Sequence, residues 1–253
     1  MIGLGPLLRK ELLEAWRTRR VLVVAIVFLA FGIASPFLAR YLPELIKGLA
    51  GGQIQIVIPP PTVGDAADQF LKNLGQAGIL TAVLLAMGSV AVEKERGTAA
   101  LVLSKPASRG AYLLAKMLAI TSTLGIGLLL ASIGGYAYTA FLFEALPPFG
   151  WAGMTGLLLL ELVIYAALTF LGSVLTRSSV AAAAIGVGGL LVVALVSVLP
   201  TIGAYTPGGL SAPGKAVALG TDPGLVIGPV LVNLALLAGL FLVAWVAFRR
   251  QEL

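Results

Sequence analysis

Residues 180–199 read VAAAAIGVGGLLVVALVSVL, twenty residues in succession without a charged side chain. A bilayer core about 30 Å thick is crossed by roughly 20 apolar residues in helical form. The stretch is therefore a candidate transmembrane helix, Val180–Leu199. Five further segments have a comparable length and apolar character: Val21–Phe37, Leu74–Val92, Ala111–Phe141, Trp151–Leu175 and Leu225–Phe248. The sequence thus predicts an all-α, polytopic membrane protein with six transmembrane helices.

The composition supports a membrane protein and narrows its chemistry. Of the 253 residues, 59% are hydrophobic and only 11% are charged, whereas soluble domains are about 25% charged. The mean hydropathy is +1.03. Cysteine and histidine are both absent, which excludes thiol nucleophiles, imidazole bases and His or thiolate metal ligands. We therefore expect no catalytic residue and no metal site in the chain.

Basic residues are distributed unequally between the two sides of the predicted membrane. If both termini are cytoplasmic, the cytoplasmic side carries Arg9, Lys10, Arg17, Arg19, Arg20, Lys94, Arg96, Lys105, Arg109, Lys116, Arg177, Arg249 and Arg250. The outer side then has only Arg40, Lys47, Lys72 and Lys215. Cytoplasmic loops carry the excess of Lys and Arg, so both termini are predicted to be cytoplasmic. The net charge of +6 follows this topology and does not indicate nucleic-acid binding.

The single transmembrane domain, residues 1–253, is expected to begin with an amphipathic interfacial helix at Met1–Arg20, rather than a cleaved signal peptide. The six-span bundle then occupies residues 21–248, and residues 249–253 form a cytoplasmic tail. The longest outer loop, Leu38–Asn73, contains Pro59–Pro61 and a short helix at Asp65–Lys72. A second outer segment, Pro200–Gly224, is rich in Gly and Pro and is predicted to be irregular.

The Pro200–Gly224 segment contains a near match to a phosphate-binding loop at residues 209–216. Ala216 replaces the Ser or Thr that would bind magnesium, and no strand precedes the motif. We therefore do not interpret it as a nucleotide site.

The most informative connection is EKERGTAALVLSKPASR, residues 93–109, between the second and third spans. Gly97 interrupts the preceding helix, and Thr98 is a candidate cap for a new one. A short helix is predicted at Thr98–Ser104, with Leu101, Val102 and Leu103 exposed together. Pro106 ends it, and Ser108 is placed to cap the third span. An exposed apolar helix favours binding in a groove of a partner protein. The alternative is an ordinary loop that rests on the lipid headgroups.

The segment resembles the ABC-2 type permease family, whose members carry Glu-x-Glu-x-Gly-Thr, a short Leu-rich helix and a Pro-x-Ser-Arg exit between spans two and three. The corresponding residues here are Glu93, Glu95, Gly97, Thr98, Leu101, Leu103, Pro106, Ser108 and Arg109. The interfacial helix with Arg9-Lys10-Glu11 and the six spans extend the resemblance along the chain. It is closest to permeases of nitrous oxide reductase maturation and to unassigned bacterial and archaeal exporters.

The resemblance implies a permease subunit in the inner membrane of a prokaryote. Two permeases would form the substrate pathway, as a dimer of identical or related chains. Two separate cytosolic ATPase subunits would bind ATP and magnesium, with export the expected direction. Thr98–Ser104 would be the coupling helix, flanked by Glu93, Glu95 and Arg96, and the N-terminal helix would brace the joint.

A polar stripe crosses the fourth span. Glu161 is followed at steps of four by Tyr165, Thr169 and Ser173, so the four side chains share one helix face. An ionisable residue at mid-membrane costs roughly 2.5–3.5 kcal/mol and faces the protein interior or a water-filled cavity. The stripe is interpreted either as pathway lining or as a structural hydrogen-bond network between helices.

Small residues recur in the fifth span. The pairs Ala182/Gly186 and Ala184/Gly188 have the spacing that permits close helix approach. The family resemblance implies a dimer seam at spans one and five, while packing within the chain explains the same pattern.

Two other classes of membrane protein are alternatives to a permease subunit. A self-sufficient secondary transporter usually has two matching halves, and no convincing internal repeat is visible. An intramembrane enzyme would need carboxylate or Ser–Lys chemistry, and the spans contain no paired acids.

Overall fold

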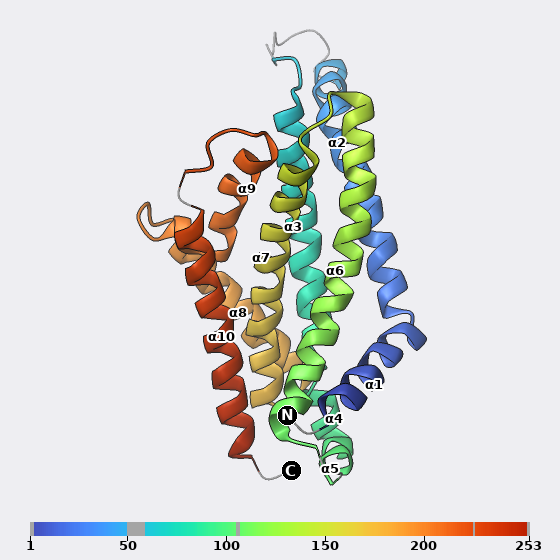
Figure 1. The fold of residues 1–253 in the computed structure, drawn as a ribbon, viewed down its shortest axis with the longest axis vertical. Helices are drawn as coiled ribbons and strands as arrows, with labels where there is room; N and C mark the ends of the chain where they lie inside the picture. The colour runs from blue at the N-terminus through green and yellow to red at the C-terminus, as the bar shows by residue number, and fades with distance from the viewer. Residues whose placement is uncertain (1–2, 50–58, 105–106, 225, 252–253) are drawn as a thin grey trace.

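The computed structural model describes residues 3–49, 59–104, 107–224 and 226–251. Every regular element in these ranges is helical (Figure 1). The α-helices are α1 (Leu4–Arg17), α2 (Arg20–Leu49), α3 (Val63–Met87), α4 (Ala91–Glu95), α5 (Thr98–Leu103), α6 (Arg109–Leu142), α7 (Pro148–Leu175), α8 (Ser179–Ser197), α9 (Ser211–Ala218) and α10 (Ile227–Arg249). Two 3₁₀ helices, η1 (Gly203–Tyr205) and η2 (Pro207–Leu210), lie between α8 and α9. Within the described ranges, six helices are long and apolar enough to cross a membrane, so the predicted all-α, six-span fold class is confirmed.

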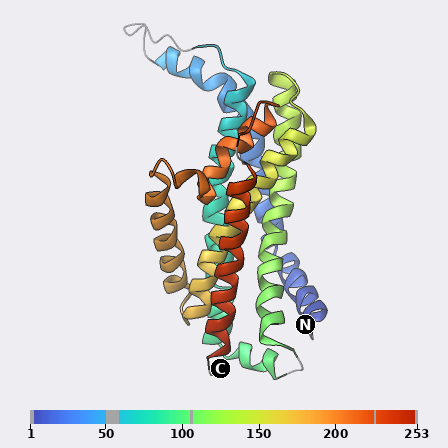
Figure 2. The ribbon, with the colours of Figure 1, turned by 60° about the vertical axis from the view of Figure 1, so that its left-hand side comes forward.

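The centre of the bundle is formed by α6 and α7, with α2 and α3 packed against them. Helices α2 and α6 approach closely at Gly32, where an added Cβ would lie 2.6 Å from the carbonyl oxygen of Ala131. The rings of Phe70 and Trp151 join α3 to α7, with centroids 4.8 Å apart. Helix α8 stands to one side of the bundle in Figure 2, and α10 lies at its edge in Figure 1; both expose long apolar faces, which suits a lipid environment.

The first outer connection differs from the prediction of a long loop at Leu38–Asn73. Helix α2 continues through Pro36 and Pro43 to Leu49, because long membrane helices tolerate the one hydrogen bond that each proline removes. The predicted short helix at Asp65–Lys72 is the beginning of α3. A capping box starts α3, in which the Thr62 side chain accepts from the Asp65 amide and the Asp65 carboxylate accepts from the Thr62 amide.

The prediction of an irregular segment at Pro200–Gly224 is also wrong. The segment contains η1, η2 and α9, and it folds back against the bundle (Figure 1). Gly150 of α7 permits this contact, since an added Cβ there would lie 2.3 Å from the carbonyl oxygen of Val217. Lys215 pairs with Asp68 of α3. Residues 209–216 all lie in η2 and α9, whereas a phosphate-binding loop is a glycine-rich loop between a strand and a helix.

The N-terminal helix has the predicted amphipathic form within its described part, Leu4–Arg17. It ends at Arg17 with Thr18 as its C-cap, and Arg19 (φ 58°) turns the chain into α2. Trp16 is 70% exposed, as expected for an aromatic residue in a membrane interface. Helix α1 lies at the same end of the bundle as α4, α5 and the C-terminal end of α10 (Figure 1).

Candidate functional site

The candidate site is the joint at this end of the bundle, built around the α4–α5 turn. Gly97 occupies the left-handed region (φ +69°) between the two helices, a conformation that glycine adopts without a steric penalty. Thr98 is the first residue of α5 rather than its cap, and its hydroxyl donates to the carbonyl of Glu93 at 3.2 Å. Ser108 caps α6 as predicted, accepting from the Ala111 amide at 3.1 Å. Pro106 lies outside the described residues.

Helix α5 exposes fewer apolar side chains than predicted. Leu101 is 69% exposed, whereas Val102 and Leu103 are partly buried and pack against the hydrophobic core. A helix of this length presents only one face outward, and the opposite face of α5 rests on its own chain. Among the described residues of α5, Leu101 is therefore the large apolar side chain that remains for an external partner.

Glu93 is the centre of an ion-pair network between α1, α4 and α6. Its Oε1 lies 2.8 Å from the Lys116 ammonium and 3.2 Å from the Lys10 ammonium. Its Oε2 accepts a hydrogen bond from the Tyr112 hydroxyl at 2.5 Å. Lys116, whose side chain is 4% exposed, also pairs with Glu11 at 3.1 Å. The network therefore attaches the N-terminal helix to α4, the helix that leads into the α4–α5 turn.

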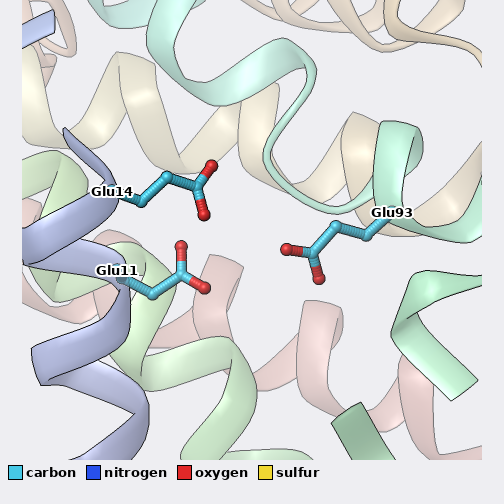
Figure 3. Close-up of side chains that lie close together, drawn as sticks. All are labelled: Glu11, Glu14 and Glu93. Carbon is cyan, nitrogen blue, oxygen red and sulfur yellow. The ribbon is translucent and has the colours of Figure 1, made fainter. Parts of the chain in front are cut away.

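Three carboxylates of the network converge: Glu11, Glu14 and Glu93 (Figure 3). Such a group resembles an oxygen-ligand metal site, but Lys10 is within 4.0 Å of all three. Burial lowers the pKa of Lys10, yet the Glu11 and Glu93 carboxylates outweigh it and raise the pKa to about 12. The ammonium groups therefore neutralise the carboxylates, and the donor set fits an ion-pair network better than a metal ion.

A second set of contacts joins α4 and the first residue of α6 to the C-terminal ends of α7 and α10. The Lys94 ammonium, on a residue only 9% exposed, donates to the carbonyl of Val174 at 2.5 Å and to Gln251 at 3.2 Å. Arg109 donates to the carbonyls of Phe248, Arg249 and Gln251 at 2.9–3.0 Å. Cations at these positions interact favourably with the carbonyl ends of helices.

The predicted flanking residues Glu95 and Arg96 are exposed beside Gly97. Glu93 and Lys94 make the contacts that hold the turn to the rest of the chain, whereas Glu95 and Arg96 present their charges on the outer surface. The joint therefore has an anchored inner side and an outer side that combines charged groups with Leu101.

The polar stripe on α7 is buried but does not form one continuous network. Ser173 accepts from two amides of the α4 region, and the Thr169 hydroxyl donates to the carbonyl of Tyr165 at 3.2 Å. Glu161 is 8% exposed, and an added Cβ on Gly208 of η2 would lie 3.8 Å from its Oε1. The stripe thus touches different elements at its two ends.

The small residues of α8 lie in two different environments, one packed against α7 and one open. Ala182 and Gly186 are fully buried or nearly so against α7, and an added Cβ on Gly186 would lie 2.1 Å from the hydroxyl oxygen of Thr169. An added Cβ on Gly188 would meet no atom within 4 Å. Ala182 and Gly186 therefore serve packing within the chain, and Gly188 lies on an open surface of α8.

Sequence reasoning did not identify the partners of Glu93 as a network. Lys116 was the available signal, because a lysine six residues inside a predicted span requires a carboxylate or carbonyl partner. Which carboxylate it meets depends on the angle at which α1 crosses the bundle, and no local sequence pattern predicts that angle.

Comparisons with known proteins agree with the geometry. The family model described as ABC-2 family transporter protein matches residues 6–213. The uncharacterized transmembrane protein YxlG of Bacillus subtilis is 31% identical over 185 residues, which cover 72% of this chain and 71% of the relative. The probable ABC transporter permease protein NosY of Pseudomonas aeruginosa is 33% identical over 144 residues, covering 55% of this chain and 45% of that protein. The matched part therefore spans less than half of NosY.

Proposed function

The chain belongs to the ABC-2 family of transporter membrane proteins, and on that premise we propose that it works as the permease subunit of an ATP-driven exporter. Two copies form the substrate pathway, and each engages a separate cytosolic ATPase subunit that binds ATP and magnesium. The permease itself carries no catalytic residue in this scheme. Both termini are cytoplasmic, in the inner membrane of a prokaryote, as the distribution of basic residues favours.

The observation that carries this proposal is the exposure of Leu101 on an anchored turn. Leu101 is 69% exposed at the end of the bundle, and Lys94 and Glu93 fix the helix that precedes it. A preorganised apolar side chain binds a groove with a smaller loss of conformational freedom than a flexible loop would. The neighbouring Glu95 and Arg96 provide a charged rim around this contact.

Co-purification of the ATPase tests the proposal. Burial of a leucine side chain contributes about 1.5–3 kcal/mol, so Leu101→Ala should weaken the complex by roughly ten- to a hundredfold. Leu84, which is 55% exposed on the apolar span α3, provides the matched control. Leu84→Ala should leave the amount of bound ATPase unchanged.

Comparison of the two variants separates a docking defect at α5 from the general effect of removing an exposed leucine side chain. Monodisperse Leu101→Ala protein with less ATPase supports the proposal. Wild-type permease that captures no ATPase, or Leu101→Ala protein that binds it as tightly as wild type, contradicts docking through α5.

A further inference from the structure

Helix α4 is attached to α7 at its first residue. The first N–H groups of a helix have no partner within it, and here the hydroxyl oxygen of Ser173 accepts from the amides of Val90 at 3.0 Å and Ala91 at 2.9 Å. Ser173 is fully buried. A side chain of α7 therefore performs the capping that a local residue usually provides, and the beginning of α4 is fixed to α7.

The attachment is repeated at the next residue of α7. The carbonyl of Val174 accepts from the Lys94 ammonium at 2.5 Å and from the Gln251 side-chain amide at 2.9 Å. Lys94 lies in the last turn of α4, three residues before the Gly97 break that leads to α5. Both ends of α4 are thus held by adjacent residues of one transmembrane helix.

The same helix contacts the folded-back segment farther along its length. Glu161 lies twelve residues before Ser173, about 18 Å along the helix axis, and it faces Gly208 of η2. Beyond it, Gly150 of α7 is in close contact with Val217 of α9. The folded-back segment also forms an open groove, which is lined by residues of η1, η2 and α9 together with Ser197 and Pro229.

Building on the proposed function, we infer that Lys94 and Ser173 are positioning residues for transport. They make α7 the element through which a displacement of α5 reaches the groove formed by η1, η2 and α9. A displacement of α5 moves α4, because only the short Gly97 turn separates them. Helix α4 in turn moves α7, because it is bonded to two successive residues of α7, Ser173 and Val174. The groove responds because α7 packs on η2 and α9, with Glu161 at the contact with Gly208.

Hydrogen–deuterium exchange of the purified chain in lipid nanodiscs tests this link without any ATPase. The variants are Lys94→Met and Ser173→Ala, with Lys94→Arg as the conservative rescue. Lys72→Met and Ser122→Ala are the matched controls. Lys72 is an exposed lysine of α3, and the Ser122 hydroxyl bonds only the Leu118 carbonyl of its own helix among the described residues.

Exchange should rise several-fold at residues 90–104 and also at residues 203–218 in both test variants. It should stay unchanged at residues 119–131 of α6, in the rescue variant and in the controls. A rise confined to residues 90–104 would overturn the inference, and so would an equal rise at residues 119–131 in both test variants. Neither result depends on ATPase binding, so failure here is distinguishable from failure of the proposed function.

Discussion

The ammonium nitrogen of Lys116 lies 2.8 Å from Oε1 of Glu93, joining the long helix α6 to α4, the short helix that precedes α5. The Lys116 side chain is only 4% exposed, and its ion pairs with the Glu93 and Glu11 carboxylates compensate for this burial. Removing one partner of a buried ion pair destabilises a protein more than the intact pair stabilises it, because the remaining charge stays buried.

Glu93→Gln should therefore lower the thermal stability of the permease measurably. Loss of a partner from a buried pair costs about 3–5 kcal/mol, and the remaining Lys116–Glu11 contact at 3.1 Å should bring the loss to the lower end of that range. Thermal unfolding in detergent measures the effect. Glu95→Gln is the matched control, since Glu95 is exposed, and it should unfold with wild type. Equal unfolding temperatures for the two variants would contradict the role given to Glu93.

The spans were predictable because a helix that crosses a membrane needs a long apolar segment, and each span has that composition within its own residues. Helices α6, α7, α8 and α10 begin and end within three residues of the predicted segments. Errors arose where packing between distant segments decides the outcome. Gly150 and Lys215 hold α9 against α7 and α3, so a stretch rich in Gly and Pro becomes helical.

The joint shows the same division between local and distant information. Gly97 and Ser108 were identified because turns and caps depend on nearby residues. The burial of Leu103 could not be predicted, because it depends on the angle at which α5 returns to the core. Likewise, Lys94 finds Val174 and Gln251, residues far away in the sequence.

The orientation of the chain is directly testable because it contains no cysteine, so an introduced cysteine is a unique label. Ser104→Cys, beyond the end of α5, should be shielded from a membrane-impermeant maleimide in intact cells. Asp222→Cys, an exposed position between α9 and α10, should react. Membrane permeabilisation should make both react. Labelling of Ser104→Cys in intact cells would reverse the proposed topology.

The two glycines of α8 should behave differently when replaced. Gly186→Leu should destabilise the monomer by about 1–3 kcal/mol or more, because the side chain would be forced into Thr169. Gly188→Leu meets open space and should leave unfolding unchanged. If the open face of α8 forms the dimer seam, Gly188→Leu should reduce the dimer fraction in size-exclusion chromatography with light scattering. An unchanged fraction would remove Gly188 from that seam.

Glu161 tests whether the buried end of the α7 stripe takes part in transport. Glu161→Gln preserves the shape of the buried side chain but removes its ability to ionise. The fold should therefore tolerate the substitution, and ATPase co-purification should stay at the wild-type level.

Coupled turnover should change instead, since an intramembrane carboxyl is retained at a free-energy cost and is expected to meet the transported species or a water-filled path. The measurement is ATP hydrolysis by the reconstituted complex as candidate substrates are added. Thr169→Val, on the same face of α7 and fully buried, is the matched control and should keep its substrate response. Loss of folded Glu161→Gln protein would favour a structural role for the carboxyl. Wild-type stimulation in a folded Glu161→Gln complex would place the pathway elsewhere in the bundle.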